Sequence, residues 1–247
     1  VDPVRDERGW RFAQSEPDPL HGWRFLSEAY LASDPDYSAR VTVPVLWDKE
    51  TQRIVSNSDD DIMRMFETEF DALGDAGLDL YPVHLRAEID ALNDLLYATV
   101  NDGVYRAGFA TSQRAYEKAA YRLFETLDAM EERLSKRRYL FGSQPVESDW
   151  RFFVTLVRFD AVYYVHFKCN LLRVADYPNV YGYLRDLYQI DGIAETVDFD
   201  HIKRHYYYTH DDINPSRIVP IGPLQDLGSP HGRERLGTSQ ISIGNSQ

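Results

Sequence analysis

The sequence predicts an α+β fold dominated by helices, with a small β/α unit followed by a larger all-helical unit. Runs of β-branched residues typical of strands gather near the start of the chain, and amphipathic stretches with helical spacing fill most of the rest. The hydrophobic content of 43% suffices for a sizeable core in 247 residues. We expect three parts: a β/α domain over 1–73, a helical domain over 80–217 and a C-terminal extension over 218–247.

The β/α part contains two strand-like and two helix-like runs. The segments 40–48 (RVTVPVLWD) and 54–57 (IVSN) are typical of strands, and the segments 23–33 and 61–73 have helical spacing. Pro44 interrupts the first run, because proline has no N–H to donate to a β-ladder. Three interpretations stay open: an edge strand that begins at Pro44, a loop packed by its valines, or a turn that directs backbone groups toward a ligand.

The helical part contains four long periodic segments, at 83–101, 112–137, 148–167 and 178–189. From about Ile218 the chain is rich in Gly, Pro and Ser, and we expect its last residues to form a loose tail. A β/α unit followed by a helical unit favours a binding site in the cleft between them. The chain opens directly on what resembles an interior strand, so we expect a strand and a helix to precede it.

The charge excludes nucleic acid as a partner. The net charge is −13, with 26 Asp against 14 Glu and 22 Arg against 5 Lys. Such a negative field repels phosphates, and it keeps a protein soluble where salt screens charge. We favour adaptation to a salt-loaded cytoplasm over an ordinary acidic protein. No apolar run approaches the ~20 residues of a membrane span and no signal-peptide core is present, so we expect a soluble, cytoplasmic protein.

Clustered tyrosines are the main candidates for chemistry among the 17 in the chain. Tyr105 lies in NDGVYRAGFA, Tyr163 in FDAVYY and Tyr206 in KRHYYY. A phenol in a dry pocket holds a proton for an oxygen leaving group, or hydrogen-bonds a thiolate and favours its charged form. The alternative is that these tyrosines pack between helices and satisfy their hydroxyls locally.

The histidines and the cysteine predict neither a metal site nor a nucleophile. The spacing of His201, His205 and His210 places side chains on one helix face, but there is no HExxH motif and no thiolate cluster, so we expect no metal. Cys169 ends an apolar helix, where the helix C-terminus disfavours a thiolate. We therefore expect a buried structural cysteine, and a single cysteine excludes an intrachain disulfide.

The run NSDDDI at 57–62 marks the start of a helix. Ser58 or Asp59 is the expected N-cap, and the acids that follow stabilise the first turn. Alternatively, this helix start holds the α-amino acid end of a ligand.

Several of these segments together resemble the glutathionyl-hydroquinone reductases, the Xi class of glutathione transferases. The similarity runs from Val1 to Leu236 and rests on RVTVPVLWD, NDGVYRAGFATSQ, TLVRFDAVYYVHFKCN, GYLRDLYQIDGIAETVDFDHIKRHYY and INPSRIVPIGPLQDLGSPHGR. It implies a thioredoxin-like N-terminal domain, incomplete at its start, followed by an all-α transferase domain. It also implies a small-molecule thiol, an aromatic hydroquinone conjugate as substrate and a homodimer.

The resemblance implies a thiol-binding site in the first domain. The Val43–Pro44 bond is expected to be cis, with the backbone N–H and C=O of Val43 offered to the cysteinyl part of glutathione. The residues that match thiol-binding positions are Trp10, Arg40, Val41, Thr42, Val43, Pro44, Ser58 and Asp59.

Three tyrosines match catalytic positions of the family. Tyr105 resembles the proton donor or acceptor, and Tyr163 and Tyr206 match phenols that lower the pKa of the reactive thiol. In the implied reaction a cysteine thiolate attacks the thioether sulfur of a glutathionyl-hydroquinone. The hydroquinone then leaves with a proton, and a second thiol resolves the mixed disulfide.

The chain departs from the family pattern in three places. The family nucleophile belongs to a Cys-Pro-Trp-Ala-like motif that these 247 residues lack, and Cys169 matches a different cysteine. Where the family has Glu-Ser, this chain has Ser58-Asp59, and Asp59 repels a carboxylate unless the two residues have exchanged roles, so the identity of the thiol stays open. If the chain is adapted to salt, γ-glutamylcysteine is an alternative thiol to glutathione. A Ser/Thr-x-x-Asp capping box is reduced to Val146 and Asp149.

Three functions therefore fit the sequence. The first is reduction of glutathionyl-hydroquinones to hydroquinones, which makes the protein an enzyme. The others are thiol or quinone binding without catalysis, and an omega-like thioltransferase activity.

Overall fold

The computed structural model describes residues 1–70, 72–73 and 77–239. Its contacts divide the chain into two compact units, Val1–Leu78 and Asp79–Gln247. Part of the segment that links the two predicted domains, and the predicted loose tail beyond residue 239, lie outside the described residues.

The N-terminal unit contains the helices α1 (Ser27–Ser33) and α2 (Asp59–Thr68) and the strands β1 (Leu46–Asp48) and β2 (Arg53–Ser56). The strands pair antiparallel, with Trp47 opposite Ile54. The strand predicted over 40–48 is correct only at its end, because the ladder begins two residues after Pro44, which has no N–H to donate.

The helices of this unit are shorter than predicted. The helix predicted over 23–33 begins only at Ser27, because the residues before it form an extended pair with the 10–12 segment. Phe12 N–H donates to Arg24 C=O, and Leu26 N–H donates to Trp10 C=O, each at 2.9 Å. Leu26, Ala29 and Tyr30 form the buried core of the unit.

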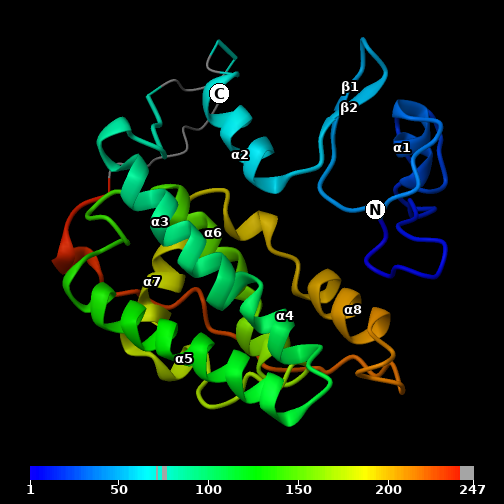
Figure 1. Cartoon of the computed structure of the whole chain (residues 1–247). Coiled ribbons are helices and arrows are strands. Elements are labelled where there is room, and N and C mark those ends of the chain that lie inside the picture. The colour runs from blue at the N-terminus through cyan, green and yellow to red at the C-terminus, as the bar shows by residue number, and fades with distance from the viewer. Residues whose placement is uncertain (71, 74–76, 240–247) are drawn as a thin grey trace. The chain divides into compact units, whose positions relative to one another are not determined.

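The second unit is a helical bundle in which the long helix α5 (Gln113–Lys136) packs against α4 (Gly103–Gly108) and α7 (Pro178–Tyr188) (Figure 1). Ser112 caps α5, since its Oγ accepts from Ala115 N–H at 3.3 Å. The other elements are η1 (Val83–Leu85), α3 (Arg86–Leu96), η2 (Tyr97–Asn101), α6 (Glu147–Arg158), η3 (Phe159–Tyr163), η4 (Val174–Asp176), η5 (Ala194–Thr196), α8 (Phe199–Thr209) and η6 (Glu234–Leu236).

Two predicted helices are interrupted by π-helical turns. The segment 83–101 ends in η2, and the segment 148–167 leaves regular helix at Arg158 and continues as η3. Such turns occur often at functional sites because they redirect side chains without ending the helix. The helix α8 was not among the four predicted segments.

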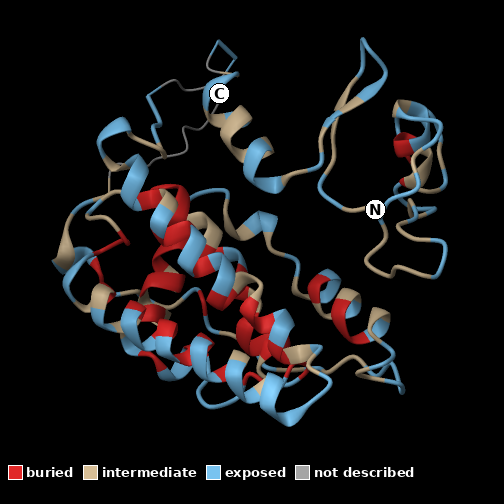
Figure 2. Ribbon diagram, in the orientation of Figure 1, coloured by how far each residue is buried: buried red, intermediate tan, exposed pale blue. Residues whose placement is uncertain are grey.

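The core of the bundle lies on the inward faces of its helices, which Figure 2 shows in red. Leu96, Leu123, Leu127, Phe152 and Leu156 are fully buried. Burying one such side chain contributes about 1.5–3 kcal/mol, so the contacts among these helices hold the bundle together.

The buried carboxylate of Asp149 fixes the start of α6. It accepts hydrogen bonds from the N–H groups of Val146 (2.8 Å) and Leu140 (2.9 Å) and from the hydroxyl of Tyr183 (2.8 Å). Val146 is the N-cap and supplies no side-chain acceptor, so only the acid half of the expected capping box is present. Burial raises the pKa of Asp149 to about 6.

Arg233, which is buried, ties the C-terminal extension to the bundle. Its guanidinium donates to the carbonyls of Leu134 (2.9 Å), Arg138 (2.8 Å) and Asn179 (3.2 Å). The extension therefore satisfies carbonyls at the end of α5 and at the start of α7. Among the described helices, none is long and apolar enough to cross a membrane.

Candidate functional site

The hydroxyls of three tyrosines form a continuous hydrogen-bonded chain in the helical unit. Tyr105 comes from α4, Tyr206 from α8 and Tyr163 from η3. The Tyr206 oxygen lies 2.5 Å from that of Tyr105 and 2.8 Å from that of Tyr163. The three tyrosines singled out from separate sequence segments are therefore brought together in one place.

Two local features position the three hydrogen-bonded tyrosines. Asn101, at the end of η2, donates through Nδ2 to Arg151 C=O (2.8 Å) and to Thr155 Oγ1 (2.7 Å), which fixes the approach to α4 against α6. The ring of Phe167 lies 5.3 Å from that of Tyr105 and 5.5 Å from that of Tyr163. Phe167 thus packs behind both phenols.

Burial keeps the inner phenols protonated. It raises the pKa of Tyr163 and of Tyr206, and the neighbouring phenols add to the effect because a second negative charge is unfavourable there. Tyr105 is 36% exposed, whereas Tyr206 and Tyr163 are buried. The chain therefore runs from an accessible hydroxyl to two buried donors, which suits it to stabilise a negative oxygen or sulfur placed at Tyr105.

A histidine pair lies next to the tyrosines. His166 Nε2 and His210 Nδ1 are 3.3 Å apart, and the ring of His210 lies 5.6 Å from that of Tyr206. Burial, with the nearby His210 and Lys168, lowers the pKa of His166 to about 4, so this imidazole is neutral near pH 7. No local pattern marks His166, because its contact with His210 joins segments 44 positions apart.

The other histidines and the cysteine are the remaining candidates for a metal site or a nucleophile. The described residues contain no group of three His, Cys, Asp or Glu side chains placed to hold a metal ion. Cys169 is buried, and its Sγ lies 3.8 Å from Phe167 C=O and 4.0 Å from Val104 C=O. Burial raises the pKa of its thiol to about 12, which confirms the expected structural cysteine.

In the N-terminal unit, the Val43–Pro44 bond is cis, as the resemblance implied. Val43 is 41% exposed. Within the described part of the chain its backbone N–H and C=O make no hydrogen bond. Both groups are therefore available to a ligand with the complementary donor and acceptor.

A buried tyrosine fixes this segment. The hydroxyl of Tyr30 donates to Thr42 C=O at 2.8 Å, and Asn57 Nδ2 donates to Tyr30 Oη and to Thr42 Oγ1, each at 3.2 Å. Tyr37 donates to Arg40 C=O at 2.8 Å. The contacts of Tyr30 and Asn57 join residues far apart in sequence, so sequence reasoning missed both.

Ser58 and Asp59 form the start of α2, as predicted. Ser58 is the N-cap, and its Oγ accepts from Asp61 N–H at 3.2 Å. Asp59 lies in the first helical turn, and Trp10 packs against the small core around Leu26.

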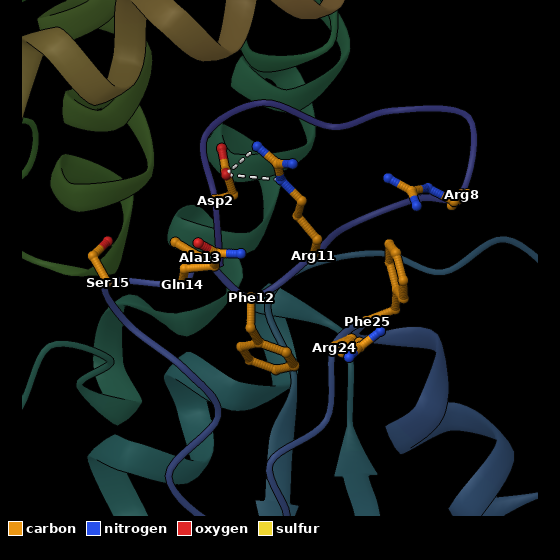
Figure 3. Close-up of a pocket in the computed structure, with 9 residues that line it drawn as sticks. All are labelled: Asp2, Arg8, Arg11, Phe12, Ala13, Gln14, Ser15, Arg24 and Phe25. Atoms are coloured by element: carbon orange, nitrogen blue, oxygen red, sulfur yellow. Dashed lines mark hydrogen bonds and ion pairs between the residues drawn. The ribbon is translucent and has the colours of Figure 1, made fainter.

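Arginines surround a separate pocket of about 820 Å³ in the same unit (Figure 3). Asp2 accepts from Arg11 Nε at 2.8 Å, and the Arg8 guanidinium lies 5.0 Å from the centre of the Phe25 ring. Arg24 also lines the pocket. The predicted thiol-binding residues are not among its lining residues, so this pocket is not the thiol site that the sequence predicts.

The fold and the helical unit define a glutathione transferase. Residues 113–186 match the family described as glutathione S-transferase, C-terminal domain. The Xi-class transferase from Natrialba magadii superposes with a TM-score of 0.94 at 48% identity, over 97% of this chain and 76% of that chain. The thioredoxin-like and all-α organisation expected from the sequence is thereby confirmed.

Two curated relatives narrow the family. Glutathionyl-hydroquinone reductase YqjG of Escherichia coli is 55% identical over 95% of this chain and 73% of the relative, and PcpF of Sphingobium chlorophenolicum is 47% identical over 92% and 74%. The glutathione-bound structure of YqjG has a TM-score of 0.93 at 54% identity, over 95% of this chain and 78% of that chain. The chain belongs to the glutathionyl-hydroquinone reductases, the Xi class of glutathione transferases.

Proposed function

We propose that the protein catalyses the thiol-dependent reduction of glutathionyl-hydroquinones to hydroquinones, the activity for which the E. coli and S. chlorophenolicum relatives are named. The observation that carries the proposal is the chain of hydroxyls from Tyr105 through Tyr206 to Tyr163. Three hydrogen-bonded phenols, of which Tyr105 is accessible, suit a substrate that loses a sulfur substituent and gains a proton.

In the proposed reaction, Tyr105 donates a proton and Tyr206 supports it. A thiolate attacks the thioether sulfur, the carbon–sulfur bond breaks, and its electron pair stays with the hydroquinone ring, which takes a proton. Tyr105, as the most exposed phenol, supplies that proton, and Tyr206 donates a hydrogen bond to the resulting Tyr105 oxygen. A second thiol then resolves the mixed disulfide and releases the enzyme thiolate.

The thiol co-substrate is held by the N-terminal unit. Val43 supplies backbone N–H and C=O to its cysteinyl part, with Trp10, the 40–44 segment and the start of α2 around it. The glutathione-bound YqjG structure supports glutathione as that thiol. The finer candidate is γ-glutamylcysteine, which follows from the salt adaptation that the excess of Asp and the scarcity of Lys favour.

The attacking thiolate is not Cys169. Its thiol is buried and its pKa is raised to about 12, so it is uncharged near pH 7. The resemblance gives the nucleophilic role to the cysteine of a Cys-Pro-Trp-Ala-like motif, which these 247 residues do not contain. The activity test therefore uses the protein purified from its native cell, with its intact mass measured first.

The test measures hydroquinone release from a glutathionyl-hydroquinone with glutathione and with γ-glutamylcysteine. We expect one disulfide formed per hydroquinone released, and a lower kcat for Tyr105→Phe. Tyr121→Phe is the control, because Tyr121 is an exposed tyrosine of α5. Binding without turnover would establish the non-catalytic alternative, and turnover only with simple mixed disulfides would establish the thioltransferase. We also propose that the protein is a homodimer, which light scattering in high salt tests. We further propose that it is cytoplasmic.

A further inference from the structure

The histidine pair joins the two segments that carry the buried tyrosines of the tyrosine chain. His166 lies one turn after Tyr163, and its backbone N–H donates to Val162 C=O at 2.8 Å. His210 lies one turn after Tyr206, and its backbone N–H donates to Tyr206 C=O at 3.3 Å. Each histidine is therefore fixed to the backbone turn of its tyrosine.

Hydrogen bonds between side chains connect these segments at two levels. The hydroxyl oxygens of Tyr163 and Tyr206 are 2.8 Å apart. One turn farther along both segments, His166 Nε2 lies 3.3 Å from His210 Nδ1. The hydrogen bond between the imidazoles therefore holds the two segments together beside the hydroxyls.

The ring of His210 is held among aromatic side chains. Its centre lies 5.1 Å from that of the Phe109 ring and 5.9 Å from that of the Phe167 ring. It also meets the Tyr206 ring nearly at right angles, with the ring centres 5.6 Å apart and an interplanar angle of 80°. Because packed rings at this distance do not rotate independently, the orientation of His210 limits that of Tyr206.

The surroundings of His166 favour a polar role over simple packing. The residue is 4% exposed, and its ring lies 4.7 Å from that of Tyr207 and 5.2 Å from that of Phe167. A buried polar group costs free energy unless it is hydrogen-bonded, and an apolar side chain would fill the same space without that cost. Buried polar groups whose hydrogen bonds are satisfied hold a core in one arrangement. The hydrogen bond to His210 is thus a reason for an imidazole at this position.

We propose that His166 is a positioning residue: through its hydrogen bond to His210, it holds the Tyr206 hydroxyl at the centre of the tyrosine chain. This inference rests on the proposed reductase function, in which Tyr206 supports the proton donor Tyr105. The oxygens of these two tyrosines are 2.5 Å apart, so a displacement of about 1 Å takes them to the limit of a hydrogen bond. A misplacement of that size costs up to about 10²-fold in rate.

Steady-state kinetics of the protein produced in its native cell, with a glutathionyl-hydroquinone and glutathione, test the proposal. His166→Phe keeps a ring but removes the hydrogen bond, and we expect kcat to fall by about tenfold with KM for glutathione unchanged. His166→Gln restores most of kcat, because its amide carries both a donor and an acceptor. Tyr207→Phe is the matched control: it removes another hydrogen bond between the same segments, from Tyr207 to Ala161 C=O, and leaves kcat unchanged.

A double variant separates positioning from a general structural role. If His166 acts through Tyr206, His166→Phe lowers kcat of the wild type but causes no further loss in Tyr206→Phe. An equal loss in both backgrounds, or no rescue by His166→Gln, overturns the proposal. His210→Phe removes the same hydrogen bond from the less buried partner and is expected to lower kcat equally, so the test stands even where His166→Phe does not fold.

Fluorine NMR of the protein labelled with 3-fluorotyrosine gives a readout without turnover. The Tyr206 resonance is identified by its absence from Tyr206→Phe. We expect His166→Phe to shift this resonance and to leave that of the exposed Tyr121 in place. An unshifted Tyr206 resonance overturns the proposal. If the wild type releases no hydroquinone, the reductase function alone fails, and the resonance still decides whether His166 positions Tyr206.

Discussion

Gly108 of α4 lies directly against the ring of Phe167. A Cβ added at Gly108 would lie 2.2 Å from Phe167 Cγ, far inside van der Waals contact. Phe167 is fully buried and packs on both Tyr105 and Tyr163. The absence of a side chain at Gly108 is therefore a condition for the position of the tyrosine chain.

The variant Gly108→Ala is expected to displace the Phe167 ring and to destabilise the protein by about 1–3 kcal/mol, the usual cost of overpacking a core. Gly103→Ala is the matched control in the same helix, because its Cβ would approach only Ala98 C=O, at 3.9 Å. Urea unfolding measures both. Equal stability of Gly108→Ala and Gly103→Ala would contradict the packing argument.

Tyr206→Phe is expected to break both hydrogen bonds of the tyrosine chain, because its hydroxyl is the central one. If the chain supports proton transfer, kcat for a glutathionyl-hydroquinone falls by about 10²-fold. The neighbouring Tyr207→Phe is the control: the Tyr207 hydroxyl donates to Ala161 C=O at 3.2 Å and lies outside the chain. Steady-state kinetics on both variants decides, and an unchanged kcat for Tyr206→Phe would remove the chain from the mechanism.

Val146→Thr is expected to stabilise the protein. Val146 is the N-cap of α6 in extended conformation, and a threonine hydroxyl there can accept a backbone N–H of the first turn. The gain is about 1 kcal/mol, or about 2–4 °C in Tm for a chain of this size. Val146→Ala controls for the loss of packing, since Val146 is buried. A thermal melt of Val146→Thr identical to wild type would refute the cap.

His166 is expected to make the protein sensitive to acid. Its pKa is lowered to about 4 in the folded state from 6.5, so the unfolded chain binds the proton first as pH falls. The stability is complete above pH 6.5 and is lost progressively toward pH 4, by about 3 kcal/mol. Burial raises the pKa of Asp149, which acts in the opposite direction between about pH 6 and 3.8.

The comparison of wild type with His166→Gln isolates the histidine, since both proteins keep Asp149. Urea unfolding at several pH values should show a difference between them that changes between pH 6.5 and 4 and is constant above. A difference that does not vary with pH would show that His166 has the same pKa in the folded and the unfolded state, which would contradict the lowered pKa.

Local signals in the sequence predicted the helices with strong caps. The segment 112–137 became α5 almost residue for residue, because Ser112 caps its start and its apolar residues repeat at helical spacing. The π-helical turns η2 and η3 were not predictable, since the apolar spacing continues through them while the backbone adapts to neighbouring helices. Tyr30 and Asn57, which hold the segment before Val43, were missed because their contacts join residues far apart in sequence.

The tyrosine site shows the same division between local and tertiary information. The family resemblance singled out Tyr105 and Tyr206, but their hydrogen bond joins residues 101 positions apart. No periodicity reports a contact of that range, and the burial that sets the protonation of Tyr206 follows only from the folded bundle. Sequence reasoning therefore supplied the participants, and the tertiary structure supplied their arrangement.

The buried guanidinium of Arg233 also constrains how the chain matures during synthesis. Three carbonyls from α5, from the segment after it and from the start of α7 converge on a side chain that the ribosome adds about a hundred positions after the first of them, at Leu134. The helical unit can collapse early, but its final packing must wait until Arg233 has left the exit tunnel. Nascent chains stalled before that residue should remain open to proteases at the end of α5.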